Sequence, residues 1–125
     1  MPVRVLIADD HRLFAEALRA ILSSDRRIDV VGLAASGEEA VQKADELSPD
    51  VILMDISMPG VDGVEATRRI LAAHSDVNVV MVTGSDARQD IDAARTAGAA
   101  GYVTKDRIAA ELIDAIIDIG AQPLR

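Results

Sequence analysis

The feature that most constrains the fold of this chain is a regular alternation of apolar runs with helical patterns. Runs rich in Val, Ile, Leu and Met, each suited to a strand, begin near Val3, Ile28, Val51, Val77 and Gly101. Their spacing accommodates one strand, one helix and two turns, and leaves no room for a linker. Because alternating strands and helices connect by right-handed crossovers, they form a parallel sheet covered on both faces. We therefore expect an α/β fold, a flavodoxin-like doubly wound (βα)5 domain with the strand order 2-1-3-4-5 that is typical of this class.

The segments between these runs carry apolar residues at helical spacing. One stripe consists of Leu13, Phe14, Ala17, Leu18, Ile21 and Leu22. A second, Ala40, Val41, Ala44 and Leu47, follows a Ser36-x-x-Glu39 capping box and is ended by Pro49. Further helices are predicted over about 64–73, about 87–97, and a last segment that carries Ile108, Leu112, Ala115, Ile116 and Ile119. Gly98 and Gly120 are predicted to end the last two helices.

Composition limits the class of protein. At 125 residues the chain is expected to be one domain, and the absence of cysteine excludes disulfides, thiolate metal sites and cysteine nucleophiles. A net charge of -8, with Arg26-Arg27 and Arg68-Arg69 as isolated basic pairs, argues against direct nucleic-acid binding. Neither an export signal nor an apolar span is recognisable, so a soluble cytoplasmic protein is the expectation.

Acidic residues follow two of the predicted strands, and a lysine follows a third. Asp9 and Asp10 come after the first run, Asp55 ends the third, and Lys105 follows the fifth. Ligands bind at the carboxyl edge of an open parallel sheet, where these side chains would meet. Clustered carboxylates repel one another and raise their pKa values unless a cation joins them. The arrangement therefore predicts a metal site.

Four separated motifs carry a resemblance to a known family. They are Asp9-Asp10, the run Met54-Asp55-Ile56-Ser57-Met58-Pro59-Gly60-Val61-Asp62-Gly63, Val82-Thr83-Gly84, and Lys105. Together they closely resemble the receiver domain of bacterial two-component response regulators, over nearly the whole chain. Asp9-Asp10-His11-x-Leu13-Phe14 and Tyr102-Val-Thr-Lys105-Asp106 resemble the NarL/LuxR subgroup, in which a helix-turn-helix domain follows the receiver. Many receivers have proline after the lysine, where this chain has Asp106.

The resemblance implies a magnesium-dependent phosphoryl transfer. Asp55 would attack the phosphohistidine of a sensor histidine kinase and become an aspartyl phosphate. Asp10, Asp55 and the backbone carbonyl of Ser57 would bind Mg²⁺, with Asp9 acting largely through a water. Lys105 and Thr83 would contact the phosphoryl oxygens.

The resemblance also implies a switch. Thr83 would move toward the phosphoryl group and vacate space for Tyr102, which would change the surface formed by the fourth helix, fifth strand and fifth helix and favour a homodimer. Residues 1–120 would form the receiver and 121–125 the start of a linker, so that DNA is bound only by an output domain outside this chain; a stand-alone receiver is the alternative. Such a protein is a phosphoacceptor rather than a multiple-turnover enzyme.

Two other motifs that would use Asp55 lack residues that they require. A calcium loop starting at Asp55 would have Pro59 and Ala66 at ligand positions, and a haloacid-dehalogenase-like phosphatase would need an aspartate where Ser57 stands. No phosphate-binding glycine motif is present. A receiver that acts by binding alone, without phosphorylation, stays open. His11 and His74 are expected to be structural.

Overall fold

The computed structural model describes residues 2–58, 60–84, 88–105 and 107–121. The strands are β1 (Val3–Ala8), β2 (Ile28–Ala34), β3 (Val51–Asp55), β4 (Asn78–Thr83) and β5 (Gly101–Thr104). The helices are α1 (Arg12–Ser23), α2 (Gly37–Leu47), α3 (Gly63–Ala73), α4 (Arg88–Ala97) and α5 (Ile108–Ala121). All strand pairs are parallel, in the order β2-β1-β3-β4-β5. The predicted fold and strand order are confirmed.

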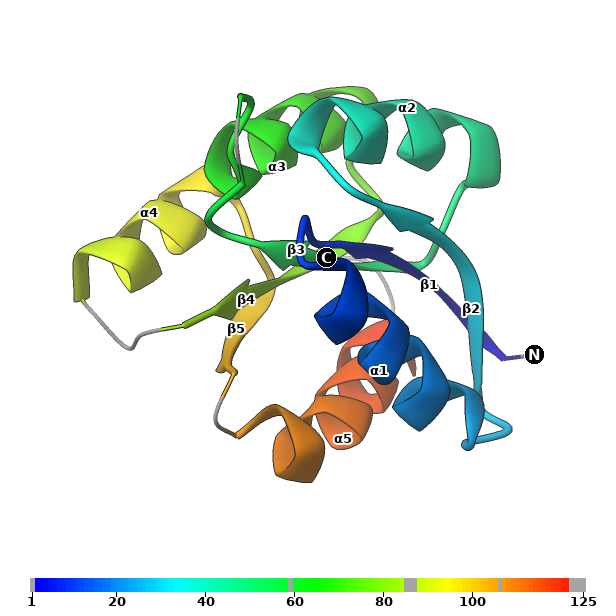
Figure 1. Cartoon of the computed structure of the whole chain (residues 1–125). Coiled ribbons are helices and arrows are strands. Elements are labelled where there is room, and N and C mark those ends of the chain that lie inside the picture. Colours follow the sequence, from blue (N-terminus) through cyan, green and yellow to red (C-terminus); the bar gives the residue numbers. More distant parts are fainter. Residues whose placement is uncertain (1, 59, 85–87, 106, 122–125) are drawn as a thin grey trace.

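The sheet separates two layers of helices (Figure 1), and a hydrophobic cluster lies on each of its faces. α1 and α5 cover one face, and α2, α3 and α4 cover the other. Side chains alternate along β1, so that Val5 and Ile7 face the first layer while Leu6 and Ala8 face the second. Every residue of the central strand β3 is buried. A strand covered on both faces favours apolar residues, which explains the unbroken apolar run Val51–Met54 before the buried Asp55.

The orientation of α1 differs from the prediction. Ala15, Leu18 and Leu22 form its buried face, whereas Leu13 is 85% exposed and Ile21 is 38% exposed. Ala17 is also exposed, and Phe14 is half-buried. The predicted apolar stripe is wider than the side of a helix that can face a sheet, and packing selects the i, i+3, i+7 row within it.

Ser36 caps the start of α2 as predicted, but Glu39 reaches back to the N–H of Ala35, one residue before the cap, and not to that of Ser36. Ser36 Oγ accepts a hydrogen bond from the Glu39 N–H at 3.1 Å, and Glu39 Oε1 accepts one from the Ala35 N–H at 2.6 Å. The helix ends at Leu47, after which Ser48 adopts a left-handed conformation with φ 48° and Pro49 follows. Both ends of α2 are therefore determined locally, as the sequence indicated.

The two predicted glycine caps have different outcomes. Gly98 has φ +101°, and its N–H donates to the Arg95 carbonyl at 3.0 Å, so it ends α4 as predicted. The prediction for Gly120 is wrong, because α5 continues through it to Ala121. A glycine inside a helix costs only about 1 kcal/mol relative to alanine, which does not by itself end a packed helix.

Some predicted positions lie at the ends of elements or outside the described segments. Val77 is buried but precedes β4, which begins one residue later. Ala87 and Asp106 lie outside the described residues, as does the side chain of Ile119. Among the helices of the described segments, none is long and apolar enough to span a bilayer.

Candidate functional site

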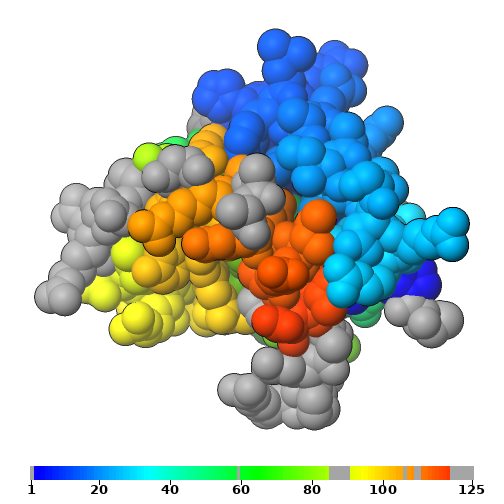
Figure 2. All heavy atoms as spheres, turned by 90° about the horizontal axis from the view of Figure 1, so that it is seen from below, coloured from blue at the N-terminus to red at the C-terminus, as the bar shows by residue number. Residues whose placement is uncertain are grey.

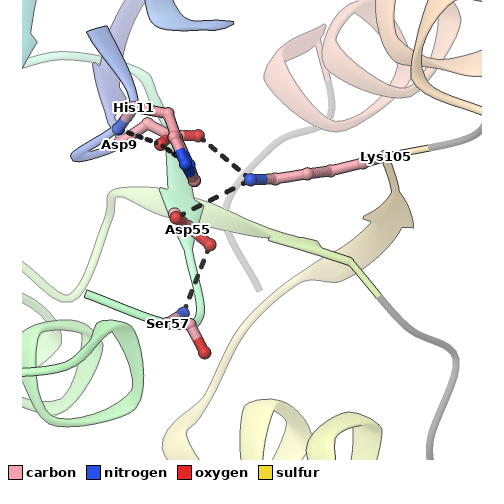
Figure 3. A network of polar contacts seen from close by, with 5 residues as sticks. All are labelled: Asp9, His11, Asp55, Ser57 and Lys105. Atoms are coloured by element: carbon pink, nitrogen blue, oxygen red, sulfur yellow. Dashed lines mark hydrogen bonds and ion pairs between the residues drawn. The ribbon is translucent and has the colours of Figure 1, made fainter.

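The carboxyl ends of β1 and β3 lie side by side in the sheet. Ala8 pairs with Met54, so the residues that follow, Asp9 and Asp55, emerge next to each other. On the other side of β3, Asp55 pairs with Val82, and Thr83 is the next residue along β4. Lys105 follows β5, and its N–H donates to the Thr83 carbonyl at 2.8 Å. Parallel pairing therefore brings four separate parts of the sequence to one edge. Figure 3 shows three of them, represented by Asp9, Asp55 and Lys105.

An acidic cluster occupies this edge. Asp9, Asp10, His11 and Asp55 each offer one ligand atom, and these atoms all lie within 4.8 Å of one another. Asp9 and Asp55 are buried, at 3% and 4% exposure, whereas Asp10 and His11 are exposed. An ion with bonds of about 2.1 Å separates opposite ligands by about 4.2 Å, so small side-chain rotations would let this donor set surround one cation.

Asp9 supports this fit. Its Oδ1 accepts the His11 N–H at 2.8 Å. Its Oδ2 is buried and, among the described residues, has no hydrogen-bond partner. A buried carboxylate oxygen without a donor is costly, and a cation would satisfy it. Carboxylate oxygens are the ligands that Mg²⁺ and Mn²⁺ prefer.

Lys105 supplies a positive charge opposite these carboxylates. Its Nζ lies 3.7 Å from Asp9 Oδ2 and 3.9 Å from Asp55 Oδ2, and the side chain is 27% exposed. Figure 3 shows the ammonium directed between the two aspartates. Both distances exceed that of a charge-assisted hydrogen bond, so the contacts are ion pairs with room between the groups.

The environment of Asp55 favours its neutral form. Burial and the neighbouring charge of Asp9 raise the pKa of Asp55 to about 6, against the opposing effects of the Ser57 N–H and Lys105. The Ser57 N–H donates to Asp55 Oδ1 at 3.2 Å. Negative charge is therefore in excess at this edge, and an added cation would relieve it.

The loop from β3 to α3 is held tightly under the site. The Ile56 N–H donates to the Val82 carbonyl at 3.0 Å. A Cβ at Gly63 would lie 2.2 Å from the Asp55 carbonyl oxygen, so only glycine permits this approach. Beside the loop is a cavity of about 610 Å³ whose lining includes Asp10, Ser57 and Asp62. Ala93 of α4 also lines this cavity, so the site is open on the side of α4.

The two residues predicted to form a switch have different surroundings. Thr83 is 3% exposed at the end of β4, whereas Tyr102 is 45% exposed. In the sheet register Tyr102 pairs with Met81, and Thr104 pairs with Thr83. Tyr102 lies at a cavity of about 260 Å³ between α4 and β5. The residues are therefore on neighbouring strands but not directly opposite each other.

Two neighbours of the site were not predicted as part of it. His11 is the N-cap residue of α1, and its Nδ1 lies 3.9 Å from Asp9 Oδ1. The ring of Phe14 lies under Lys105, with 4.6 Å between Nζ and the ring centroid. The position of His11 directly after two candidate ligands indicates that it lies near the site. Nothing in the sequence distinguishes Phe14 from the core residues of the same helix. His74 hydrogen-bonds Asp45 and ties the end of α3 to α2, consistent with a structural role.

The fold and the site together define a class of protein. A doubly wound parallel sheet carries an acidic cluster, a lysine and a threonine at the carboxyl ends of its strands. A family model for the response regulator receiver domain matches residues 5–117. The chain therefore belongs to the response regulator receiver domain family.

Comparison with individual relatives indicates the subgroup of receivers to which the chain belongs. The chain is 46% identical to response regulator GacA of Pseudomonas viridiflava over 114 residues, which cover 91% of this chain and 53% of GacA. The signal receiver domain of NarL from Mycobacterium tuberculosis has a TM-score of 0.92 at 32% identity, covering 98% of both chains. A CheX-CheY-BeF3-Mg complex from Borrelia burgdorferi matches with a TM-score of 0.87 at 26% identity, covering 95% of this chain and 90% of that one. The chain is thus a receiver of the NarL/LuxR type and spans about half the length of GacA.

Proposed function

We propose that this chain is a phosphorylation-controlled receiver in which Asp55 accepts a phosphoryl group from a sensor histidine kinase. The observation that carries this proposal is the placement of Asp55. Its carboxylate is 4% exposed, lies within 4.8 Å of other acidic ligand atoms, and has the Lys105 ammonium 3.9 Å from Oδ2. Burying a carboxylate close to other acidic groups costs stability, and such unfavourable arrangements are typical of functional sites.

The metal proposed for this site is Mg²⁺. Asp10, Asp55 and the Ser57 backbone carbonyl would be direct ligands, and Asp9 would act largely through a water. The orphaned Oδ2 of Asp9 and the oxygen-rich donor set support a hard cation. When bound, Mg²⁺ would neutralise charge on the transferring phosphoryl group. The CheX-CheY complex from Borrelia burgdorferi contains BeF3 and Mg²⁺, which supports the same chemistry here.

The chain's own residues would have simple tasks in the transfer. A carboxylate oxygen of Asp55 forms the new bond to phosphorus while the bond from phosphorus to the histidine nitrogen breaks, and that nitrogen keeps the electron pair. Lys105 would move from its present ion pairs to the phosphoryl oxygens, and the Thr83 hydroxyl would donate to another. Nothing in this step requires a general base, since Asp55 reacts as a carboxylate.

Partners and output follow from the same proposal. The phosphoryl donor would be a sensor kinase in the cytoplasm, and the product would favour a homodimer through the surface of α4, β5 and α5. The matched segment covers only 53% of GacA, so we propose that an output domain that binds DNA follows a linker that begins near residue 121. The chain would not turn over an external substrate.

The test is to weigh the intact protein after incubation with acetyl phosphate and Mg²⁺. Wild type should gain about 80 Da, the mass of one phosphoryl group, and Asp55→Asn should not. Asp29→Asn, an exposed carboxylate on the edge strand β2, is the matched control and should be modified like wild type. An adduct of equal yield in Asp55→Asn would contradict the assignment, and no adduct in wild type would favour a receiver that acts by binding alone.

A further inference from the structure

Phe14 lies where α1 meets the acidic site. It is the third residue of α1, is half-buried, and packs against the hydrophobic layer beneath that helix. Its ring faces the Lys105 ammonium, with 4.6 Å between Nζ and the centroid. That distance is within the range of a cation–π interaction. Figure 2 shows the surface on which α1, in blue, lies beside the orange and red segments of β5 and α5.

The contacts of Lys105 leave its ammonium incompletely fixed by the carboxylates. At 3.7 Å and 3.9 Å, neither Asp9 Oδ2 nor Asp55 Oδ2 is at hydrogen-bonding distance. Lysine has a flexible four-carbon stem, so ion pairs of this length restrict its position only weakly. The ring of Phe14 provides a third contact, with 4.6 Å between Nζ and the centroid.

A ring suits this position better than a third carboxylate. The attraction between an ammonium and a π face does not neutralise the charge and supplies no strong acceptor that would compete for the N–H donors. Lys105 would thus stay available to phosphoryl oxygens. A further acidic side chain would instead raise the pKa of Asp55 and bind Lys105 more tightly than the reaction requires.

The position of the ring is itself determined by the site. Asp9 Oδ1 accepts the His11 N–H at 2.8 Å, and the Ala15 N–H donates to the His11 carbonyl at 2.9 Å. Ala15 is 3% exposed and anchors the same turn to the sheet. Asp9 therefore orients the first turn of α1, and that turn presents Phe14 to Lys105.

We propose that Phe14 is a positioning residue whose ring holds the Lys105 ammonium between Asp9 and Asp55, ready to contact a phosphoryl group on Asp55. This inference rests on the proposed function. The competing explanation is that Phe14 only packs against the core, in which case its loss would change stability without any dependence on Lys105.

A double-mutant cycle distinguishes the two explanations. The dissociation constant for beryllofluoride, a phosphoryl mimic, is measured by calorimetry with saturating Mg²⁺ for wild type, Phe14→Leu, Lys105→Met and the double variant. Phe14→Leu should weaken binding roughly fivefold, the size of a partly desolvated cation–π interaction. In the Lys105→Met background the same substitution should change binding by less than about twofold.

Two further variants control for folding and for the aromatic face. Phe14→Tyr keeps the ring and should bind within about twofold of wild type. Leu13→Ala removes an apolar side chain from the same turn that is 85% exposed, and should bind like wild type. Thermal unfolding of each variant shows that it is folded at the temperature of the titration.

The outcomes separate this inference from the function on which it rests. If wild type binds beryllofluoride and Phe14→Leu binds it equally well, or loses the same factor in both backgrounds, the ring does not position Lys105. If wild type does not bind beryllofluoride, the proposed phosphoacceptor function fails and the positioning role fails with it.

Discussion

At the scale of single residues, the dominant feature is a carboxylate placed where its charge is unfavourable. Asp55 lies at the end of a fully buried strand, near Asp9, and its pKa is raised to about 6. Desolvation is the larger cause and the charge of Asp9 the second. Lys105 offsets part of this, but its distance of 3.9 Å leaves the site short of positive charge.

The raised pKa predicts how stability depends on pH in metal-free protein. Between about pH 4 and pH 6 the folded state retains a proton that the unfolded state has released, so the free energy of unfolding should fall as pH rises through this window. Asp55→Asn should lack this fall and exceed wild type at pH 7.5 by up to about 3 kcal/mol. Urea unfolding in EDTA from pH 4 to pH 8 measures the difference. Parallel curves for the two proteins would contradict the burial argument.

A second prediction at this scale concerns the cation. If Mg²⁺ relieves the excess negative charge, a concentration tenfold above its dissociation constant should raise the thermal midpoint of wild type by roughly 5 °C. Asp10→Ala should abolish the rise, and Asp9→Ala should reduce it less completely. An undiminished rise in Asp10→Ala, recorded by calorimetry with and without EDTA, would remove Asp10 from the ligand set.

At the scale of elements, the start of α2 supports the loop that carries the site. A Cβ on Gly37 would lie 2.1 Å from the Val61 carbonyl oxygen. Glu38 Oε1 accepts the Val61 N–H at 3.3 Å. The loop from β3 to α3 is therefore braced by a helix that contributes no residue to the acidic cluster.

This brace predicts a sharp contrast between two glycines. Gly37→Ala should destabilise the protein by roughly 2 kcal/mol or more, because a backbone oxygen must move to admit the methyl group. Gly84→Ala is the matched control, since a Cβ there would meet no atom of the described structure within 4 Å. Urea unfolding gives both values, and a Gly37→Ala variant as stable as Gly84→Ala would show that the loop gives way easily.

At the scale of the whole molecule, the sheet connects the acidic edge to the surface formed by α4 and β5. Lys105 and Thr83 are joined through the backbone, and the next strand position inward pairs Val82 with Val103. Tyr102 lies beside the cavity of about 260 Å³ between α4 and β5. We therefore expect a movement of Thr83 to change the surface of α4 and β5 through β5, and to leave β2, at the other end of the sheet, unchanged.

This geometry predicts a directional response to phosphorylation. Beryllofluoride should alter amide-exchange protection in residues 88–117 and shift sedimentation toward a dimer, while β2 stays unchanged. Thr83→Ala should still be phosphorylated on Asp55 but respond weakly, because it lacks the hydroxyl that we propose draws the strand toward the phosphoryl group. A wild-type protein whose exchange and sedimentation do not respond to the mimic would contradict the switch.

Much of this molecule was determined by local sequence. Short-range periodicity and turn chemistry, which the sequence shows directly, determine the apolar runs and the caps at Ser36 and Gly98. They also place Asp9, Asp10, Asp55 and Lys105 at or just after the ends of strands. Because parallel strands all end at one edge of the sheet, the convergence of these side chains followed from the fold class.

Only the tertiary structure decided the rest. The packing of separate elements determines which face of α1 is buried and how close Phe14 comes to Lys105. It also determines the distances of Lys105 from two carboxylates and the offset of Tyr102 from Thr83. The pKa of Asp55 likewise reflects burial and neighbours from other strands. Periodicity gives the direction of a side chain relative to its own helix or strand. Contacts between side chains of different elements depend on how those elements pack together, and a local sequence pattern carries no information about that packing.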